Sequence, residues 1–186
     1  MGSLTIHATA LAGLYEIHGN TSSDARGRFS RLFCEQELAA IRPGLHFTQI
    51  SLSQTAAKGS VRGMHYQMPP AAEAKLVRCL RGRVFDVALD LRTGSTTFLQ
   101  WHAVELAEDN DRAIFIPEGF AHGFQTLSDD AQLLYMHTVS WTPASEAGLR
   151  HDDPRLAIAW PDSVTVSSER DRSFALLGPD FVGVSL

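Results

Sequence analysis

Short apolar runs separated by turn-forming residues cover most of this chain, and they predict strands rather than long helices. Seven strands are predicted, over residues 47–52, 76–80, 83–91, 99–106, 113–116, 123–127 and 132–141. Arg81-Gly82, between the second and third of them, is typical of a hairpin turn. One helix is predicted over residues 35–41, and Pro43 ends it. So many short strands favour a β-sandwich or barrel over a βαβ fold.

Alternation of side chains is clearest in the predicted strand 83–91. One face carries the apolar residues Phe85, Val87, Leu89 and Leu91, and the other carries Val84, Asp86, Ala88 and Asp90. A face that mixes small and acidic side chains either lines a ligand cavity or meets solvent. We expect solvent or a turn for Asp90, whereas both alternatives stay open for Asp86.

Size and composition are those of an ordinary globular protein. With 186 residues, 44% hydrophobic and 20% charged, we expect one domain over 1–186, with an N-terminal strand or arm and a C-terminal helical tail. The net charge of −5 argues against nucleic acid or an anionic membrane as partner. Cys34 and Cys79 form no CxxC motif, which indicates reduced thiols in a cytoplasmic protein. No apolar run reaches membrane-spanning length, and the first residues do not resemble a secretory signal.

The segment Arg62-Gly63-Met64-His65-Tyr66-Gln67, followed by Lys75-Leu76-Val77-Arg78, carries the clearest chemistry. It places one titratable imidazole, His65, near two cations, Arg62 and Lys75. An imidazole exchanges protons near neutral pH, and cations hold anionic groups. The segment therefore indicates proton transfer on a phosphate-bearing substrate. The competing interpretations are a hydrogen-bonded core position for His65 and a solvated surface charge for Lys75.

A second segment, Ile116 to Phe124, contains Pro117-Glu118-Gly119 and then His122. The spacing Pro-x-Gly-x-x-His resembles the second motif of cupins, in many of which that histidine binds a metal. Such a metal needs three or four donors, usually including a His-x-His pair. Here the partner segment reads His65-Tyr66-Gln67, so the second histidine of the pair is absent and the metal interpretation is disfavoured.

Further motifs follow in a fixed order along the chain. They are Phe85-Asp86-Val87-Ala88-Leu89-Asp90-Leu91-Arg92, Leu134-Tyr135, Gly148-Leu149-Arg150-His151-Asp152-Asp153-Pro154 and Ile158-Ala159-Trp160-Pro161. Together with the two segments above, they resemble the dTDP-4-dehydrorhamnose 3,5-epimerase family from about Asp24 to Asp171. The resemblance implies an all-β, cupin-like double-stranded β-helix (jelly roll) with a few short helices. It also implies a homodimer that needs neither metal nor cofactor.

By the same resemblance, the substrate is a thymidine diphosphate (dTDP) 4-keto-6-deoxyhexose, which is inverted at the two carbons beside the ketone. Such a reaction needs a base, a group that stabilises the enolate oxygen, and an acid on the opposite face. His65 matches the base, Tyr135 the proton donor, and Asp171 the carboxylate that orients His65. Asp171 also fits a helix-capping box with Ser168, and a tyrosine in an apolar strand is compatible with core or interface packing.

The resemblance implies roles for further residues in substrate binding. Lys75 and His122 match groups that hold the keto oxygen and neighbouring hydroxyls or phosphate; Arg26, Arg62 and Arg170 match contacts to the diphosphate; Gln49 and Glu146 match polar contacts to the nucleotide; Trp141 replaces a tyrosine that stacks on thymine. Guanidinium groups suit phosphate oxygens, and an indole stacks on a base at least as well as a phenol.

Three positions depart from the family pattern. They are Ile50-Ser51 after Gln49, Arg31 where an acidic residue is common, and Ser140 where an aromatic residue is common. We expect each to touch the nucleotide or sugar pocket. His137 is a further complication, because on an extended strand it shares a face with Tyr135 and Trp141. Packing or solvent exposure is the favoured interpretation for it, and entry into the pocket is the alternative.

Three classes of function remain. The first is the 3,5-epimerase, or a relative that inverts only one carbon and shares nearly the same motifs. The second is a metal-dependent cupin oxygenase or isomerase with His65 and His122 as ligands, which bound metal in purified protein would reveal. The third is a non-catalytic sugar-nucleotide binder, which would require the base or acid to be lost. Both His65 and Tyr135 are present.

Overall fold

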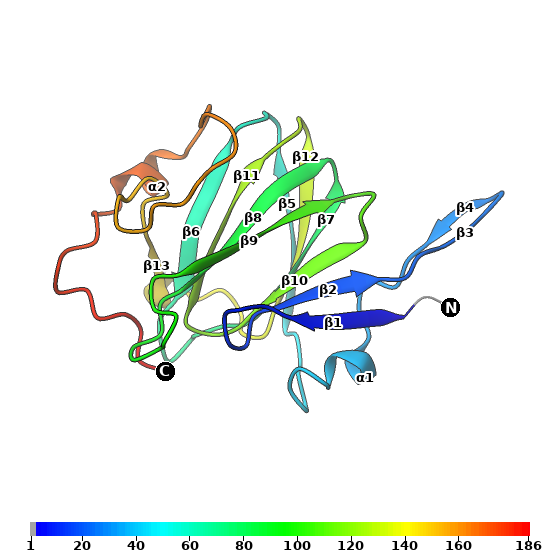
Figure 1. The fold of residues 1–186 in the computed structure, drawn as a ribbon, viewed down its shortest axis with the longest axis horizontal. Coiled ribbons are helices and arrows are strands. Elements are labelled where there is room, and N and C mark those ends of the chain that lie inside the picture. Colours follow the sequence, from blue (N-terminus) through cyan, green and yellow to red (C-terminus); the bar gives the residue numbers. More distant parts are fainter. Residues whose placement is uncertain (1–2) are drawn as a thin grey trace.

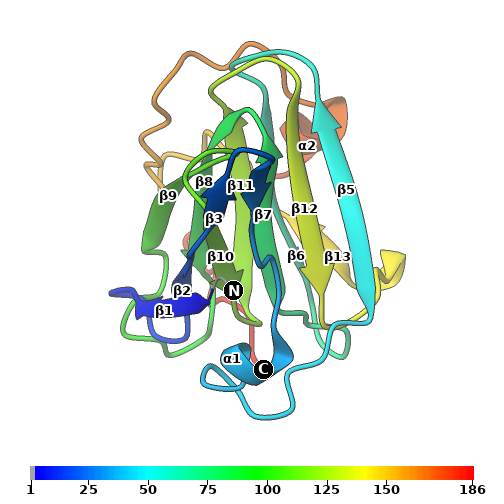
Figure 2. The same ribbon diagram turned by 90° about the vertical axis from the view of Figure 1, so that its right-hand side faces the viewer.

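The computed structural model describes residues 3–186 and has two antiparallel sheets that face each other as a sandwich (Figures 1 and 2). The six-stranded sheet has the order β1-β2-β10-β7-β12-β5, and the five-stranded sheet has the order β13-β6-β11-β8-β9. The all-β jelly roll expected from the sequence is confirmed.

The strands of the six-stranded sheet are β1 (Leu4–Ala8), β2 (Tyr15–Gly19), β5 (Gln49–Thr55), β7 (Lys75–Arg81), β10 (Arg112–Ile116) and β12 (Ala131–His137). Those of the five-stranded sheet are β6 (Val61–Gln67), β8 (Arg83–Asp90), β9 (Trp101–Ala107), β11 (Phe120–Thr126) and β13 (Glu146–Gly148). Two short strands, β3 (Ser22–Asp24) and β4 (Gly27–Phe29), form a separate hairpin that projects from the sandwich (Figure 1).

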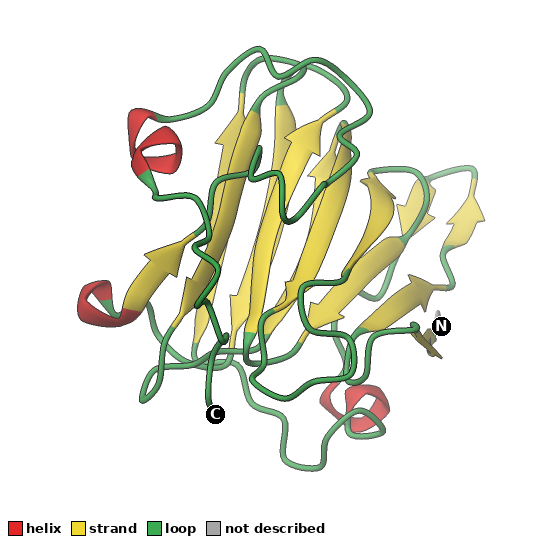
Figure 3. Ribbon diagram, turned by 60° about the vertical axis from the view of Figure 1, so that its left-hand side comes forward, coloured by secondary structure: helices red, strands yellow, loops and turns green. Residues whose placement is uncertain are grey.

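Helices are few and short, and all lie outside the sheets (Figure 3). They are α1 (Glu35–Leu38), the 3₁₀ turn η1 (Pro143–Ser145) and α2 (Glu169–Ser173). The predicted helix 35–41 is thus confirmed only for its first turn, α1. Residues 174–186 after α2 are not helical and include one isolated bridge, from Arg92 to Val184. No helix of the described chain is long and apolar enough to cross a membrane.

The main core lies between the two sheets. Val77, Ile114 and Leu133 from one sheet meet Val84 and Phe124 from the other, and all five are nearly inaccessible to solvent. Two further apolar clusters cover the outer faces, one beneath α1 and one beneath the C-terminal segment. Because both faces of β8 are covered, the alternating Phe85 and Asp86 faces are both buried rather than one being solvated.

The hairpin predicted at Arg81-Gly82 is wrong. Although β7 and β8 follow each other directly, β7 pairs with β10 and β12 while β8 pairs with β9 and β11. Gly82, at a φ of +73°, makes the corner at which the chain crosses from one sheet to the other. The turn was readable from the sequence, but the sheet that the next strand enters depends on long-range pairing.

Asp90 is fully buried, and the expectation of solvent for it is wrong whereas the expectation of a turn is confirmed. Its carboxylate accepts hydrogen bonds from Arg92, Ser95 and Thr97 and so organises the turn after β8. Burial alone would raise the pKa of Asp90, but these bonds outweigh it and lower the pKa to about 2.

Candidate active site

A cavity of about 310 Å³ opens between the two sheets, which is large enough for a small-molecule ligand. Its titratable side chains come from strands of both sheets and from the segment before β7: Arg62, His65, Tyr66, Glu73, Lys75, His122, Tyr135, His137 and Glu146. A second hollow adjoins it, lined by the C-terminal segment around α2, and Arg62 and His65 border both.

His65 lies on β6 with its side chain about one-third exposed, and it lines the cavity. Its Nε2 is 2.8 Å from Oδ1 of Asp171 in α2, and the other carboxylate oxygen accepts from the backbone N–H of Gly63. Burial would raise the pKa of Asp171, but the hydrogen bond and charge of His65 outweigh burial and lower it. With Nε2 held in this way, Nδ1 is the ring nitrogen left for a ligand.

The capping alternative for Asp171 also holds, but through the backbone. Ser168 precedes α2, and its hydroxyl accepts from the backbone N–H of Asp171. The Asp171 carboxylate takes no part in this capping bond and contacts His65 instead. The segment therefore caps the helix with one residue and delivers a carboxylate to the histidine with the other.

Two glycines let the strands of His65 and His122 approach closely, and the two histidines are neighbours across these strands. Strands β6 and β11 approach so closely that a Cβ on Gly63 would lie 2.5 Å from Cα of Gly123. Gly63 also has a φ of +123°, which side-chain-bearing residues rarely adopt. His122 is the register partner of His65, and the register shifts immediately afterwards. The glycines of Arg62-Gly63 and His122-Gly123 thus allow the same close contact between β6 and β11.

His122 forms a second histidine–carboxylate pair. Its Nε2 is 2.9 Å from both carboxylate oxygens of Asp86 on β8, and both side chains are almost fully buried. Asp86 therefore lies beneath the cavity. Of the two positions that the sequence left open for it, cavity or solvent, the solvent-exposed one is excluded. The His122 ring meets the ring of Tyr135 edge-on at 5.7 Å.

Tyr135 lies on β12 and presents its phenol to the cavity. Burial, and to a lesser degree the negative charge of Asp86, raise its pKa above the usual value for tyrosine. Its ring also stacks on that of His137 at 5.9 Å with an interplanar angle of 11°. Tyr135 is thus a protonated phenol in a rigid aromatic setting.

His137 lines the cavity, so the favoured interpretation of packing or solvent exposure is wrong on that point. Its Nδ1 is 2.8 Å from Oε2 of Glu73, and Oε1 of the same carboxylate is 3.2 Å from Nζ of Lys75. Lys75 is buried in the cavity wall, so it is not a solvated surface charge. The sequence reasoning missed Glu73. The available signal was that residues two apart on an extended segment, such as Glu73 and Lys75, share a face.

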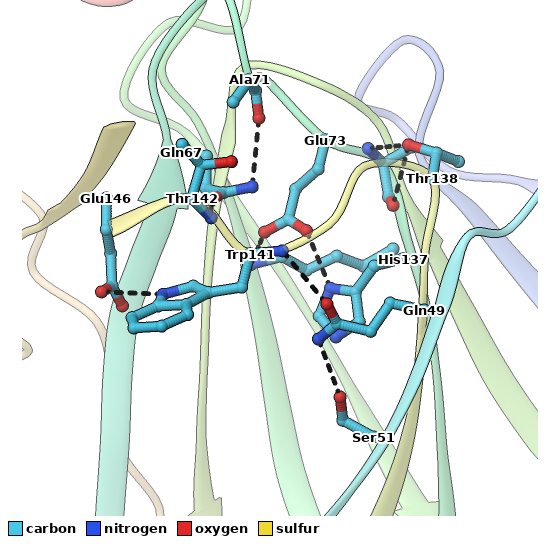
Figure 4. Close-up of polar contacts among 12 residues, drawn as sticks. Gln49, Ser51, Gln67, Ala71, Glu73, His137, Thr138, Trp141, Thr142 and Glu146 are labelled. Carbon is cyan, nitrogen blue, oxygen red and sulfur yellow. Dashed lines mark hydrogen bonds and ion pairs between the residues drawn. The ribbon is translucent and has the colours of Figure 1, made fainter. Parts of the chain in front are cut away.

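Of the residues expected at the nucleotide, Arg62, Trp141 and Glu146 line the cavity, and Figure 4 shows the contacts among Trp141, Glu146 and Gln49. The Trp141 indole N–H donates to Glu146 at 3.0 Å, and Arg170 reaches the other oxygen of Glu146 at 2.8 Å. The side chain of Gln49 accepts from the backbone N–H of Trp141 and donates to the Ser51 hydroxyl. Arg170 lies towards the second hollow, and Trp141 keeps 57% of its surface exposed.

Six residues expected at the nucleotide or sugar pocket do not line the cavity of this chain: Gln49 and Arg170, described above, and Arg26, Arg31, Ile50 and Ser140. Arg26 lies in the β3–β4 hairpin with a 90% exposed side chain that pairs with Asp24 (Figure 1). Arg31 pairs with Glu37 at 2.7 Å, and Ile50 is on the outer face of β5, 63% exposed. Ser140 contributes only its carbonyl, which accepts from Gln67 and Thr142. Of the departures, only Ser51 lines the cavity, since β5 turns alternate residues to opposite faces.

Within residues 3–186, no group of three or more His, Cys, Asp and Glu side chains is arranged to hold a metal ion. Nε2 of His65 and Nε2 of His122 each contact a different carboxylate, that of Asp171 and that of Asp86.

Comparison with known proteins identifies the family to which the chain belongs. The family model described as dTDP-4-dehydrorhamnose 3,5-epimerase matches residues 8–178. The chain belongs to the dTDP-4-dehydrorhamnose 3,5-epimerase family. The expected enzyme class, an isomerase, is therefore confirmed for this family member.

Individual members of the epimerase family cover nearly the whole chain. The dTDP-4-dehydrorhamnose 3,5-epimerase of Sinorhizobium fredii is 38% identical, over 93% of this chain and 89% of its own length. A dTDP-4-dehydrorhamnose 3-epimerase of Streptomyces niveus is also 38% identical, over 94% and 84%. The solved structure of dTDP-6-deoxy-D-glucose-3,5-epimerase from Legionella pneumophila, in complex with dTDP-4-keto-L-rhamnose, superposes with a TM-score of 0.89 at 39% identity, over 94% of this chain and 93% of that chain.

Proposed function

We propose that this chain epimerises a dTDP-4-keto-6-deoxyhexose at C3 and C5. The observation that carries the proposal is the joint presence, in one cavity, of an accessible imidazole backed by a buried carboxylate and a protonated phenol. Family membership supports the substrate class, since the Legionella relative was solved with a dTDP-4-keto sugar bound.

In the proposed reaction, His65 removes the proton from a carbon beside the ketone. The bonding pair moves into the ring to form an enolate, whose oxygen takes a hydrogen bond from Lys75. Asp171 stabilises the imidazolium that forms, since its low pKa keeps the carboxylate charged. These contributions match the two demands of the step, a positioned base and a stabilised oxyanion.

Tyr135 is the proposed acid for the second half of the reaction. Its raised pKa keeps the phenol protonated at working pH, so it has a proton to deliver to the enolate carbon. The phenolate then recovers a proton from water, and His65 releases the one it took. His122 and Asp86 hold the Tyr135 ring from beneath.

For the nucleotide, we propose that the thymine stacks on Trp141. Glu146 holds the indole N–H, Gln49 holds the Trp141 backbone N–H, and Arg62 and Arg170 face the diphosphate. Support comes from the exposed indole face and from the position of Arg62 between the two hollows. His122 and Lys75 then face the hexose.

We also propose that residues 1–186 form a single-domain protomer of a cytoplasmic homodimer. The projecting β3–β4 hairpin supports dimerisation, because Arg26 reaches a diphosphate only if the hairpin enters the cavity of another copy (Figure 1). Both cysteines are free thiols, and burial raises the pKa of Cys79 to about 11, as suits a reducing compartment. Sedimentation of wild type and Arg26→Ala, with dTDP affinity measured in parallel, tests the dimer and the arginine separately. We expect unchanged dimers with weaker binding.

The direct test is incubation of the purified chain with a dTDP-4-keto-6-deoxyhexose in deuterated water, with deuterium located by carbon. Incorporation at both C3 and C5 is expected. Incorporation at one carbon alone would assign the single-carbon alternative, which the Streptomyces niveus 3-epimerase favours. Incorporation at neither would reject the epimerase.

A further inference from the structure

We infer that Glu73 and His137 are positioning residues for Lys75: His137 holds the Glu73 carboxylate, and the carboxylate aims the Lys75 ammonium at the cavity. The inference rests on the proposed function for the role of Lys75 at the enolate oxygen. Its structural part, the aiming of the ammonium, can be tested without any activity measurement.

The three groups form a chain of contacts across the cavity wall. Nδ1 of His137 is 2.8 Å from one oxygen of Glu73, and Nζ of Lys75 is 3.2 Å from the other (Figure 4 shows the first contact). His137 and Lys75 are register partners on β12 and β7, so the paired strands fix the positions of the two residues that contact Glu73. Glu73 lies between them with a 7% exposed side chain.

Because Lys75 is buried, its ammonium depends on the contact with Glu73. An ammonium in a cavity wall loses hydration, and an opposite charge at contact distance offsets that loss. Among the described residues, Glu73 supplies the one carboxylate within 4 Å of Lys75 Nζ. One ammonium hydrogen is thereby directed to Glu73 and two remain for a ligand. Glu73 is itself kept charged: burial alone would raise its pKa, but His137 and Lys75 together lower it.

His137 is held independently of Glu73. Its ring stacks on Tyr135 nearly in parallel, and its strand neighbours are Lys75 on β7 and Gln49 on β5. A carboxylate with one oxygen tied to such a fixed ring cannot rotate away from Lys75. His137 thereby couples the wall that carries the proposed acid, Tyr135, to the cation that faces the developing oxyanion.

A merely structural role would affect folding but not the state of Lys75. The chain contains only two lysines, Lys58 and Lys75. Labelling lysine with carbon-13 at Cε therefore gives two NMR signals, one from the half-exposed Lys58, paired with Asp162, and one from buried Lys75. Lys58 is an internal reference in every sample.

The first experiment titrates these two signals in wild type, Glu73→Gln and His137→Phe. Glu73→Gln keeps the shape of the side chain but removes the negative charge that favours the ammonium form of Lys75, so the Lys75 signal should titrate at lower pH than in wild type. His137→Phe keeps an aromatic ring on Tyr135 but releases the carboxylate, and should move the midpoint less, in the same direction. Lys58 should not move. An unchanged Lys75 midpoint in Glu73→Gln would overturn the inference.

The second experiment measures deuterium exchange of the keto sugar by the same variants. Glu73→Gln should lower kcat by about fivefold to tenfold, a range expected for coupled neighbours, while the dissociation constant for dTDP stays within twofold of wild type. The alkaline limb of the kcat profile should move to lower pH together with the Lys75 midpoint. His137→Asn, whose amide can replace Nδ1 as donor, should recover most of the rate that His137→Phe loses.

A double variant and a matched control complete the test. If His137 acts through Glu73, the double variant Glu73→Gln/His137→Phe is no slower than Glu73→Gln alone. Multiplying effects would overturn that link. His102→Phe is the control, because His102 makes a comparable 2.9 Å contact to Glu16 outside the cavity. It should change neither Lys75 nor exchange. Should wild type show no exchange, the proposed function fails, whereas the NMR titration still decides whether Glu73 governs Lys75.

Discussion

His65 on β6 and His122 on β11 are neighbours across paired strands, and each contacts a carboxylate. The two histidine–carboxylate pairs differ in their exposure and in the segment that supplies the carboxylate. His65 is about one-third exposed, and its carboxylate, Asp171, comes from α2, more than one hundred residues further along the chain. His122 is 5% exposed, and its carboxylate, Asp86, comes from the adjacent strand of the same sheet. The first pair is open to a ligand, whereas the second is almost closed to solvent and borders the cavity against the edge-on ring of Tyr135.

The contrast is the basis for proposing His65 as the proton carrier and His122 as a support. A base must reach the substrate with one nitrogen while the other is held, and the His65 pair offers that arrangement. A fully buried pair with both carboxylate oxygens on one nitrogen instead fixes a ring in place and sets a local charge. The negative charge of Asp86 contributes to the raised pKa of Tyr135. The predictions below test this division.

The largest expected effect is that of Asp171→Asn. An amide in place of the carboxylate can donate to Nε2 of His65, which forces the imidazole proton onto Nδ1, the cavity side. The rate of deuterium exchange should fall by about 10²- to 10⁴-fold, with dTDP affinity nearly unchanged. Exchange kinetics and calorimetric titration with dTDP check this, and exchange within a few-fold of wild type would place the base elsewhere.

Tyr135→Phe should separate exchange from inversion. His65 can still remove and return a proton on its own face, so deuterium exchange continues without change of configuration. Formation of the inverted sugar should fall by about 10²-fold. Proton NMR of the product distinguishes the two outcomes. Loss of exchange together with inversion would mean that Tyr135 is needed already for proton removal.

Asp86→Asn should cost more stability than activity. It removes the charge from a buried hydrogen-bonded pair, and we expect the free energy of unfolding to fall by about 2 kcal/mol. Exchange should slow by no more than about tenfold, which is below the usual contribution of a direct acid or base. Urea unfolding and exchange kinetics on one preparation measure both. A rate loss as large as that of Asp171→Asn would end the distinction between the pairs.

The smallest effect is a pH-dependent difference in stability. Because the pKa of Asp171 is lowered in the folded chain, its contribution is present above the usual value of 3.8 and is lost as the pH falls through the folded value. The gap in unfolding free energy between wild type and Asp171→Asn, about 2 kcal/mol at neutral pH, should narrow below that pH. Thermal unfolding at a series of pH values measures it. A constant gap down to pH about 3 would contradict the assignment.

The sequence predicted an all-β fold because alternation is a local property, whereas the jelly roll and the grouping of Asp171 and Tyr135 with His65 came from the family resemblance. It did not predict that β7 and β8 enter different sheets, since Arg81-Gly82 encodes a turn and not a partner strand. It also left Asp86 undecided, because a strand covered on both faces shows the same alternation as one with a solvated face.

At the site, the features that the sequence did not predict are mainly contacts between segments far apart along the chain. Glu73 was missed because its partner His137 is 64 residues away, and their meeting depends on the pairing of β12 with β7. Arg26 was expected at the diphosphate, but it does not line the cavity of its own chain, and the hairpin that carries it projects from the sandwich (Figure 1). A short sequence pattern does not show whether such a hairpin contributes to the cavity of its own chain or to that of another copy.

The most direct test makes the same substitution at both neighbouring histidines. We would compare deuterium exchange into the keto sugar by His65→Asn and His122→Asn, with dTDP affinity measured for each. The account predicts that His65→Asn abolishes exchange at both carbons yet binds dTDP, whereas His122→Asn still exchanges at a measurable rate. Retained exchange in His65→Asn would contradict it.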